Sequence, residues 1–141
     1  MALTQTWRKL TGADGLQLLV CRIVGTSVSA GDDIELAVPD LAQSGNILRV
    51  HMPPSTGTHT TRQPIISQGA AGGSASAVWR HYVATDTAKA TDINDRLEGL
   101  PFALVFADGS TESLYFEPGL DTASDGVMTA DLYFVAGAGI R

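Results

Sequence analysis

The fold class follows first from residues 102–116, which read FALVFADGSTESLYF. The opening six residues are apolar on both faces of an extended chain, and Asp108-Gly109 supplies the positive φ angles of a tight turn. Leu114 and Phe116 then alternate with polar neighbours. The pattern predicts a β-hairpin whose first strand lies centrally in a sandwich or barrel, or buries one face against another subunit.

Apolar residues alternate with polar ones in further short segments along the chain. The clearest is Ile34–Val38, where three aliphatic side chains alternate with Asp33, Glu35 and Ala37, as in a strand with one wet and one dry face. The segments expected to form strands are Gln17–Val24, Ile34–Val38, Ile47–Met52, Ala77–Val83, Phe102–Ala107, Glu112–Phe116 and Val127–Val135. We therefore expect a mainly β chain: a single-domain β-sandwich or β-barrel of about seven strands with one short helix and a long loop.

The helix is expected after residue 86. Asp86 or Thr87 can cap a segment in which Ala90, Ile93 and Leu97 share one face, and Gly99 ends it.

Two segments are candidate arms of the single domain 1–141. Residues 1–12 form a possible N-terminal arm with Trp7 as its anchor, although this tryptophan can equally pack on its own core. Residues 53–76 have almost no charge and little periodicity, which predicts a long loop or arm that orders on a partner, or else a mobile surface loop. The adjacent Ile65 and Ile66 favour the first alternative, because exposed aliphatic residues at a loop tip are costly unless covered.

The charge balance opposes nucleic-acid binding, because 9 Lys and Arg face 15 Asp and Glu and the net charge is −6. All of the excess acid lies in the second half of the chain, because the first half has five acidic and five basic residues. A positive contact surface would therefore come from the bases of the first half, and a head-to-tail contact between unlike surfaces is plausible unless folding scatters the charges. Those bases are Arg8, Lys9, Arg22, Arg49 and Arg62.

The single cysteine, Cys21, lies in an apolar strand segment and is expected to be a buried thiol. No apolar run has the ~18 residues that span a bilayer, and the N-terminus lacks the apolar core of a secretory signal. We expect no membrane association and folding in a cytoplasm.

Candidate catalytic and metal-binding patterns are weak. His51, His59 and His81 have no short ligand spacing, and Ser27 and Ser29 lack the glycine spacing and strand-to-helix context of a nucleophile elbow. The acidic residues cluster where turns and helix ends use them as caps. The sequence predicts no enzyme, no cofactor and no metal. A carbohydrate-binding or adhesin module is an alternative in which Trp79 and Tyr82 would stack on sugars.

A resemblance adds to this. The chain begins Met1-Ala2-Leu3-Thr4, carries a Thr-, Gly- and Ser-rich stretch at residues 53–76, has few lysines and one thiol, and ends Gly137-Ala138-Gly139-Ile140-Arg141. In length and composition it resembles the small acidic β-proteins of tailed-bacteriophage virions, particularly the head decoration or cement proteins. No site residues are carried over from a likeness of this kind.

The resemblance implies a virion protein, made in the host cytoplasm, that binds the major capsid protein and copies of itself on the outer shell and stabilises the head. Under this interpretation the partner-contact residues would be Trp7, Arg8, Lys9, Arg62, Ile65 and Ile66, together with one sheet edge. Another virion component, such as a tail, head-completion or fibre-associated β domain, is the nearest alternative.

Overall fold

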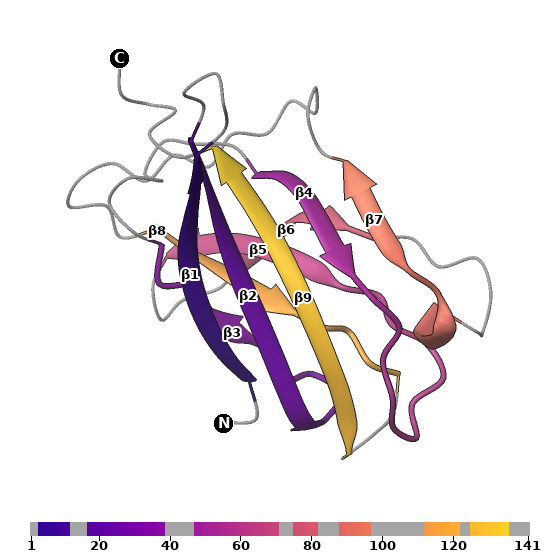
Figure 1. The fold of residues 1–141 in the computed structure, drawn as a ribbon. Coiled ribbons are helices and arrows are strands. Elements are labelled where there is room, and N and C mark those ends of the chain that lie inside the picture. The colour runs from indigo at the N-terminus through magenta and orange to yellow at the C-terminus, as the bar shows by residue number, and fades with distance from the viewer. Residues whose placement is uncertain are drawn as a thin grey trace.

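A computed structural model of the chain describes residues 3–11, 17–38, 47–70, 75–81, 88–96, 112–121 and 125–135. Within these ranges nine strands form two antiparallel sheets, packed face to face in two layers (Figure 1). The mainly β prediction is confirmed, and the arrangement corresponds to a sandwich. Six of the seven predicted strands lie among these nine, the seventh (residues 102–107) lies outside the described residues, and three segments expected to be an arm, a loop and a helix are also strands.

The first sheet has five strands in the order β1-β2-β9-β4-β7. All four neighbouring pairs are antiparallel, and β2 and β9 form the long centre of the sheet. The strands are β1 (Leu3–Thr11), β2 (Gln17–Val28), β9 (Gly126–Val135), β4 (Ile47–Met52) and β7 (Ile93–Arg96).

The second sheet has four strands in the order β3-β8-β5-β6 and lies behind the first in Figure 1. Its strands are β3 (Ile34–Glu35), β8 (Glu112–Glu117), β5 (Ile65–Ala70) and β6 (Ala75–Arg80). Strands β5 and β6 pair with each other as a hairpin, and β5 also pairs with β8.

The core lies between the two sheets and is built from the inward-facing residues of both. Cys21, Leu132 and Phe134 of the first sheet and Leu114 and Phe116 of the second are completely buried. Alternation along each strand places these side chains on one face and polar ones on the other, as the period-two pattern predicts. Cys21 is a buried free thiol, as expected from its apolar segment.

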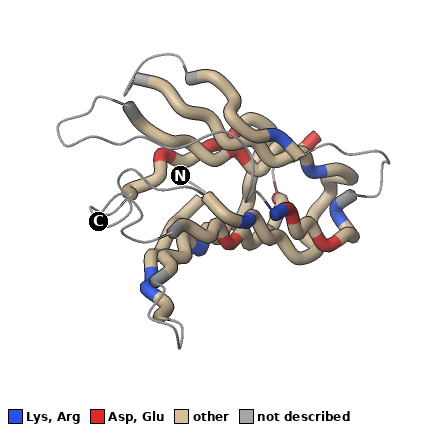
Figure 2. The backbone as a smooth tube through the Cα atoms, turned by 90° about the horizontal axis from the view of Figure 1, so that it is seen from above, with Lys and Arg blue, Asp and Glu red and all other residues tan. Residues whose placement is uncertain are grey.

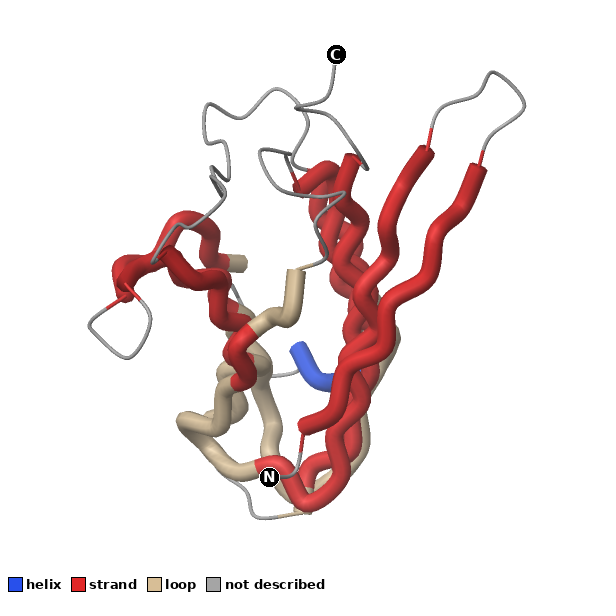
Figure 3. The backbone as a smooth tube through the Cα atoms, turned by 90° about the vertical axis from the view of Figure 1, so that its left-hand side faces the viewer, coloured by secondary structure: helices blue, strands red, loops and turns tan. Residues whose placement is uncertain are grey.

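The expected N-terminal arm is wrong for the described residues 3–11, because they form β1, which pairs with β2 along its whole length. Trp7 faces inward and packs against Phe134 with ring centroids 5.2 Å apart. Residues 8–11 are exposed, and the far end of the β1–β2 hairpin leans away from the second sheet (Figure 3).

A side chain explains why β1 stays against the sandwich. The Gln5 amide nitrogen donates to the Glu35 carbonyl oxygen at 2.8 Å, and its amide oxygen accepts from the Ala37 backbone N–H at 2.9 Å. The same oxygen accepts from Trp7 Nε1 at 3.0 Å. The Gln5 side-chain amide therefore makes the two backbone hydrogen bonds that a neighbouring strand would make with residues 35 and 37. These bonds connect the two sheets at one edge.

The long loop or arm expected at residues 53–76 is confirmed as a loop for residues 53–64, which belong to no named strand, and is wrong for residues 65–70 and 75–76. Residues 65–70 and 75–80 are strands β5 and β6, and residues 53–64 are held by hydrogen bonds to distant parts of the chain. Thr58 donates through its backbone N–H and its hydroxyl to Asp125 Oδ1, at 3.0 and 2.9 Å. Thr60 bonds the Asp121 carboxylate in the same two ways, at 3.0 and 2.6 Å. Because bonds to side chains hold this segment in place, its sequence does not need the alternation of apolar and polar residues that a strand has.

Arg62, expected to be a contact residue, is completely buried. Its guanidinium donates to the carbonyl oxygens of Pro53 and Thr91. Burial lowers the pKa of Arg62 to about 10, with nearby Asp92 opposing the shift. Arg62 therefore holds two irregular segments together inside the protein.

The helix expected after residue 86 is wrong where the structure describes it. Ala88–Ala90 form a 3₁₀ turn, and Ile93–Arg96 form strand β7. Ile93 is buried and Asn94 and Arg96 are exposed, so the segment follows a period of two rather than a helical one. Pairing with β4 outweighs a weak helical pattern in residues of low helix propensity. The strand predicted at 102–107, its turn, Tyr82 and the proposed caps at 86 and 87 lie outside the described residues.

Candidate functional site

The outer face of the first sheet carries two cross-strand rows of side chains, which follow from the register of its five strands. One row, which we call the arginine row, consists of Arg8, Val20, Tyr133, Arg49 and Arg96. The next row, which we call the paired row, consists of Thr6, Arg22, Asp131, His51 and Asn94. Together they hold four of the chain's 9 Lys and Arg residues.

The paired row is largely neutralised. Arg22 donates through Nε and one terminal nitrogen to the two carboxylate oxygens of Asp131, both at 2.9 Å. Asp131 is buried, so this two-point contact satisfies a carboxylate that water reaches poorly. His51 Nε2 lies 3.5 Å from the Asp92 carboxylate, which places a second negative charge beside this row.

The arginine row contains three arginines and no acidic residue. Arg49 and Arg96 are direct register partners on β4 and β7, and Arg8 lies at the other edge of the sheet. Like charges placed directly opposite on antiparallel strands destabilise the pair. The row therefore concentrates positive charge on one face of a chain whose net charge is −6.

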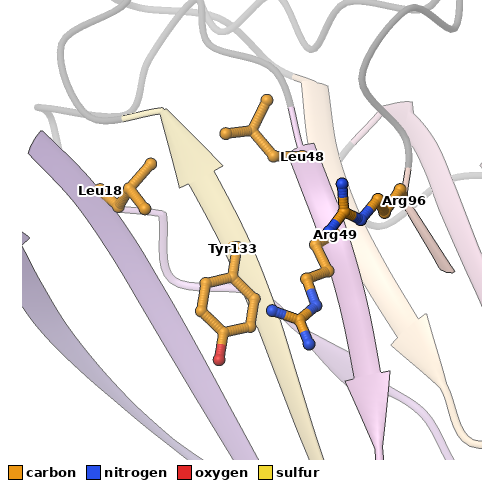
Figure 4. A pocket seen from close by; sticks show the side chains of 5 residues that line it. All are labelled: Leu18, Leu48, Arg49, Arg96 and Tyr133. Atoms are coloured by element: carbon orange, nitrogen blue, oxygen red, sulfur yellow. The ribbon is translucent and has the colours of Figure 1, made fainter. Parts of the chain in front are cut away.

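A pocket of about 270 Å³ opens in this face, lined by Leu18, Leu48, Arg49, Arg96 and Tyr133 (Figure 4). The Arg49 guanidinium lies over the Tyr133 ring, 5.3 Å from its centroid, and Arg49 Nε donates to Asn94 Oδ1 at 2.6 Å. The tyrosine and the asparagine therefore fix the direction of Arg49. No acidic residue is among these five lining residues.

The outer face of the second sheet differs in charge. Glu35 on β3 and Glu117 on β8 lie on it, opposed by Arg80 on β6. Burial raises the pKa of Glu117, and the nearby Asp33 adds to the shift. Figure 2 marks the charged positions along both layers. The two outer faces are thus unlike in charge.

The structure separates the six predicted contact residues. Arg8 belongs to the arginine row, and Lys9 is exposed at the outward-leaning end of β1. The prediction of a contact role is wrong for three residues, Trp7, Arg62 and Ile66. Trp7 packs on Phe134, and the other two are completely buried. Ile65 is half-buried on the outer face of the second sheet, away from the row.

Arg8, Arg22 and Arg49, expected as sources of positive charge, do share one face. Arg96 and Tyr133 were missed as site residues. Tyr133 lies in a segment correctly predicted as a strand, but its neighbours depend on register between distant segments. The sequence contains no clear signal for Arg96, because residues 94–96 are all polar and only the burial pattern in the structure alternates.

Among the described residues, the contact most similar to a nucleophile and its base is the hydrogen bond between Ser55 Oγ and His59 Nε2, at 2.8 Å. Both residues are buried, and no described residue hydrogen-bonds His59 Nδ1. Burial lowers the pKa of His59, and Lys89 adds to the effect, so the ring is held neutral. An enclosed pair without an orienting acid is more typical of a structural contact than of a nucleophile and its base.

Comparison with protein families, with curated proteins and with solved structures finds no match for this chain. Among the residues that the structure describes, no group of three or more His, Cys, Asp and Glu is placed to hold a metal ion. The same part of the chain contains no helix with the length and apolar character of a membrane span.

Proposed function

We propose that this chain is a structural binding protein of the head-decoration type, which attaches through its arginine row to an acidic surface of a bacteriophage major capsid protein. The observation that carries the attachment surface is the placement of Arg8, Arg49 and Arg96 in one row, where none of the described residues pairs with them as an acidic partner. The composition of the chain supports the class of particle, through its resemblance to decoration proteins.

A basic face on an acidic protein suits oriented attachment. The net negative charge repels other acidic surfaces except where the row is presented, so the charge pattern selects the docking orientation. A shell offers many equivalent sites, and many modest contacts of this kind can stabilise it together. Contacts between copies of the chain belong to the same proposal.

The proposed contact surface differs from the one expected from sequence. It replaces two flexible arms with a rigid sheet face, and it keeps Arg8 from the original set. A preformed face loses less conformational entropy on binding than an arm that must become ordered.

The carbohydrate-binding alternative loses one of its two stacking residues, because Trp79 is buried and offers no exposed ring for a sugar, while Tyr82 lies outside the described residues. Another virion component remains the second candidate, since a tail or connector domain would have similar composition.

The experiment that tests the class of function is quantitative mass spectrometry of density-gradient-purified particles from the source culture. Decoration predicts on the order of hundreds of copies of this chain per particle, in a fixed ratio to the major shell protein. A handful of copies would replace the proposal with a tail or connector role. Absence from the particles would overturn it.

A further inference from the structure

We infer that the pocket between Arg49 and Arg96 binds a dianionic oxyanion attached to a flat apolar group, of which an aryl phosphate monoester is the simplest example. This inference goes beyond attachment to a shell. It concerns a small ligand and a property that the isolated chain would have.

The charge of the pocket selects a dianion. Arg49 and Arg96 are direct register partners on strands that lie about 4.8 Å apart, so two guanidinium groups can reach one ligand. None of the five lining residues that the structure describes is acidic, and a guanidinium group provides a positive charge and up to five N–H donors. A guanidinium presents paired N–H donors that match the oxygens of a phosphate. A single negative charge would leave one of the two arginines uncompensated.

One of the two arginines is already positioned for such a ligand. Arg49 Nε is used by Asn94, so the terminal nitrogens are the groups that can donate to an incoming oxygen. The stacking of Arg49 over Tyr133 restricts the plane of the guanidinium. Pre-positioning lowers the entropy that binding would otherwise lose. Arg96 is exposed on the edge strand and can close onto the ligand from the other side.

The rest of the lining selects an apolar group next to the anion. Leu18, Leu48 and Tyr133 provide apolar and aromatic surface beside the two guanidiniums. A free phosphate would leave this surface wet, whereas a ring would cover it. The volume of about 270 Å³ suits one ring with its phosphate rather than a larger ligand.

The experiment is a titration of the purified full chain, followed by NMR amide shifts and by calorimetry, with three probes at constant pH and ionic strength. Phenyl phosphate has both the ring and the double charge. Benzenesulfonate has the ring with a single charge, and inorganic phosphate has the charge without the ring. We expect phenyl phosphate to bind about tenfold or more tightly than either of the others, with shifts confined to the strands that line the pocket.

Variants separate the contributions. Arg49→Gln and Arg96→Gln should each weaken phenyl phosphate binding by about tenfold and remove its advantage over benzenesulfonate. Tyr133→Leu should reduce its advantage over inorganic phosphate. Arg80→Gln is the matched control, because Arg80 is an exposed arginine on the other sheet, and it should leave all three affinities unchanged.

Several results would overturn the inference. They are an absence of phenyl phosphate binding, equal affinities for the three probes, or affinities that fall as much in Arg80→Gln as in Arg96→Gln. Any of them would show that the pocket has at most a diffuse attraction for anions. Since the titration uses no particle, its failure would leave the copy-number result on particles intact.

Discussion

Arg49 and Arg96 lie directly opposite each other on the neighbouring antiparallel strands β4 and β7. In the adjacent row Arg22 of β2 lies opposite Asp131 of β9, which binds it at two points. The sheet thus contains one arginine whose ion pair stabilises the fold, and two arginines whose mutual repulsion destabilises it. A pair of like charges retained on a surface is typical of a site whose function costs some stability.

Replacing Arg96 with glutamine should leave the protein as stable as the wild type or slightly more stable. Removal of one charge relieves a cross-strand repulsion of roughly 0.2–1 kcal/mol. Urea denaturation at low salt measures the change in the free energy of unfolding, and the gain should shrink as salt screens the wild-type repulsion.

Arg22→Gln is the matched substitution in the paired row and should have the opposite sign. It leaves the buried Asp131 carboxylate without its two-point partner, at a cost of about 1–3 kcal/mol. A loss of stability in Arg96→Gln as large as that in Arg22→Gln would contradict the assignment of Arg96 to function.

Stability should fall as the pH is lowered below the ordinary pKa of histidine, near 6.5. Burial first, and Lys89 second, lower the pKa of His59 in the folded protein, while Asp121 and Asp125 oppose the shift and Arg62 adds to it. Below pH 6.5 the His59 ring therefore takes up a proton more readily in the unfolded chain than in the folded chain. The contribution of the neutral ring to the free energy of unfolding is lost as the pH falls from about 6.5 towards the folded-state pKa. Thermal unfolding at a series of pH values measures the slope.

His59→Gln keeps a nitrogen that can reach Ser55 but no longer titrates, so its unfolding temperature should depend less on pH in this window. His51→Gln is the control, because His51 lies on the outer face and should retain the wild-type loss. An equal slope in wild type and His59→Gln would count against the role given to the buried ring.

The fold could be predicted where alternating residues form the core. Residues 47–52 were predicted with the bounds that β4 has, and β9 differs from its predicted start by one residue. The alternating pattern does not reveal β1, since polar Gln5 occupies one of its inward positions and the partners of its amide at Glu35 and Ala37 are tertiary contacts. Contacts between residues so far apart in the chain cannot be predicted from the local sequence.

Gly119→Ala should strongly destabilise the fold. Gly119 has a φ of +71°, and a Cβ there would collide with the backbone of Gln63. The collision adds to the cost of placing a side chain in the left-handed region, which is about 1–2 kcal/mol. Chemical denaturation, or the yield of folded protein, gives the measurement.

Gly31→Ala provides the comparison, because Gly31 has a similar φ of +86° and nothing within 4 Å of the added carbon. It should lose only the backbone cost. Equal destabilisation by the two substitutions would mean that the segment around Gln63 yields easily, against the hydrogen-bonded arrangement described for residues 53–64.

Cys21 should be unreactive in the folded protein. Burial, together with the charge of Asp131, raises its pKa to about 12, and the thiol is completely enclosed. A thiol-specific disulfide reagent at pH 8 should label the chain only in denaturant, where one thiol per chain becomes available. Rapid stoichiometric labelling without denaturant would show that the first sheet opens readily.

The site was less predictable than the fold. Arg8, Arg22 and Arg49 were recognised as the possible sources of a basic surface, and alternation places each on a solvent-facing position. Their grouping with Arg96 and Tyr133 depends on which strands are neighbours and on register, both fixed by tertiary pairing. Arg62 shows the converse, since its charge suggested a contact surface while its partners lie inside the protein.

We propose an attachment of this chain to a particle through the arginine row. Its most direct test is the binding of purified wild-type chain, the Arg49→Glu/Arg96→Glu double variant and Arg80→Glu/Lys89→Glu to particles that lack the protein, followed by co-sedimentation. The two double variants have the same net charge, and each must first show a wild-type-like unfolding transition. We predict that the wild type and Arg80→Glu/Lys89→Glu bind while the row variant does not. Undiminished binding of the folded row variant would contradict the account.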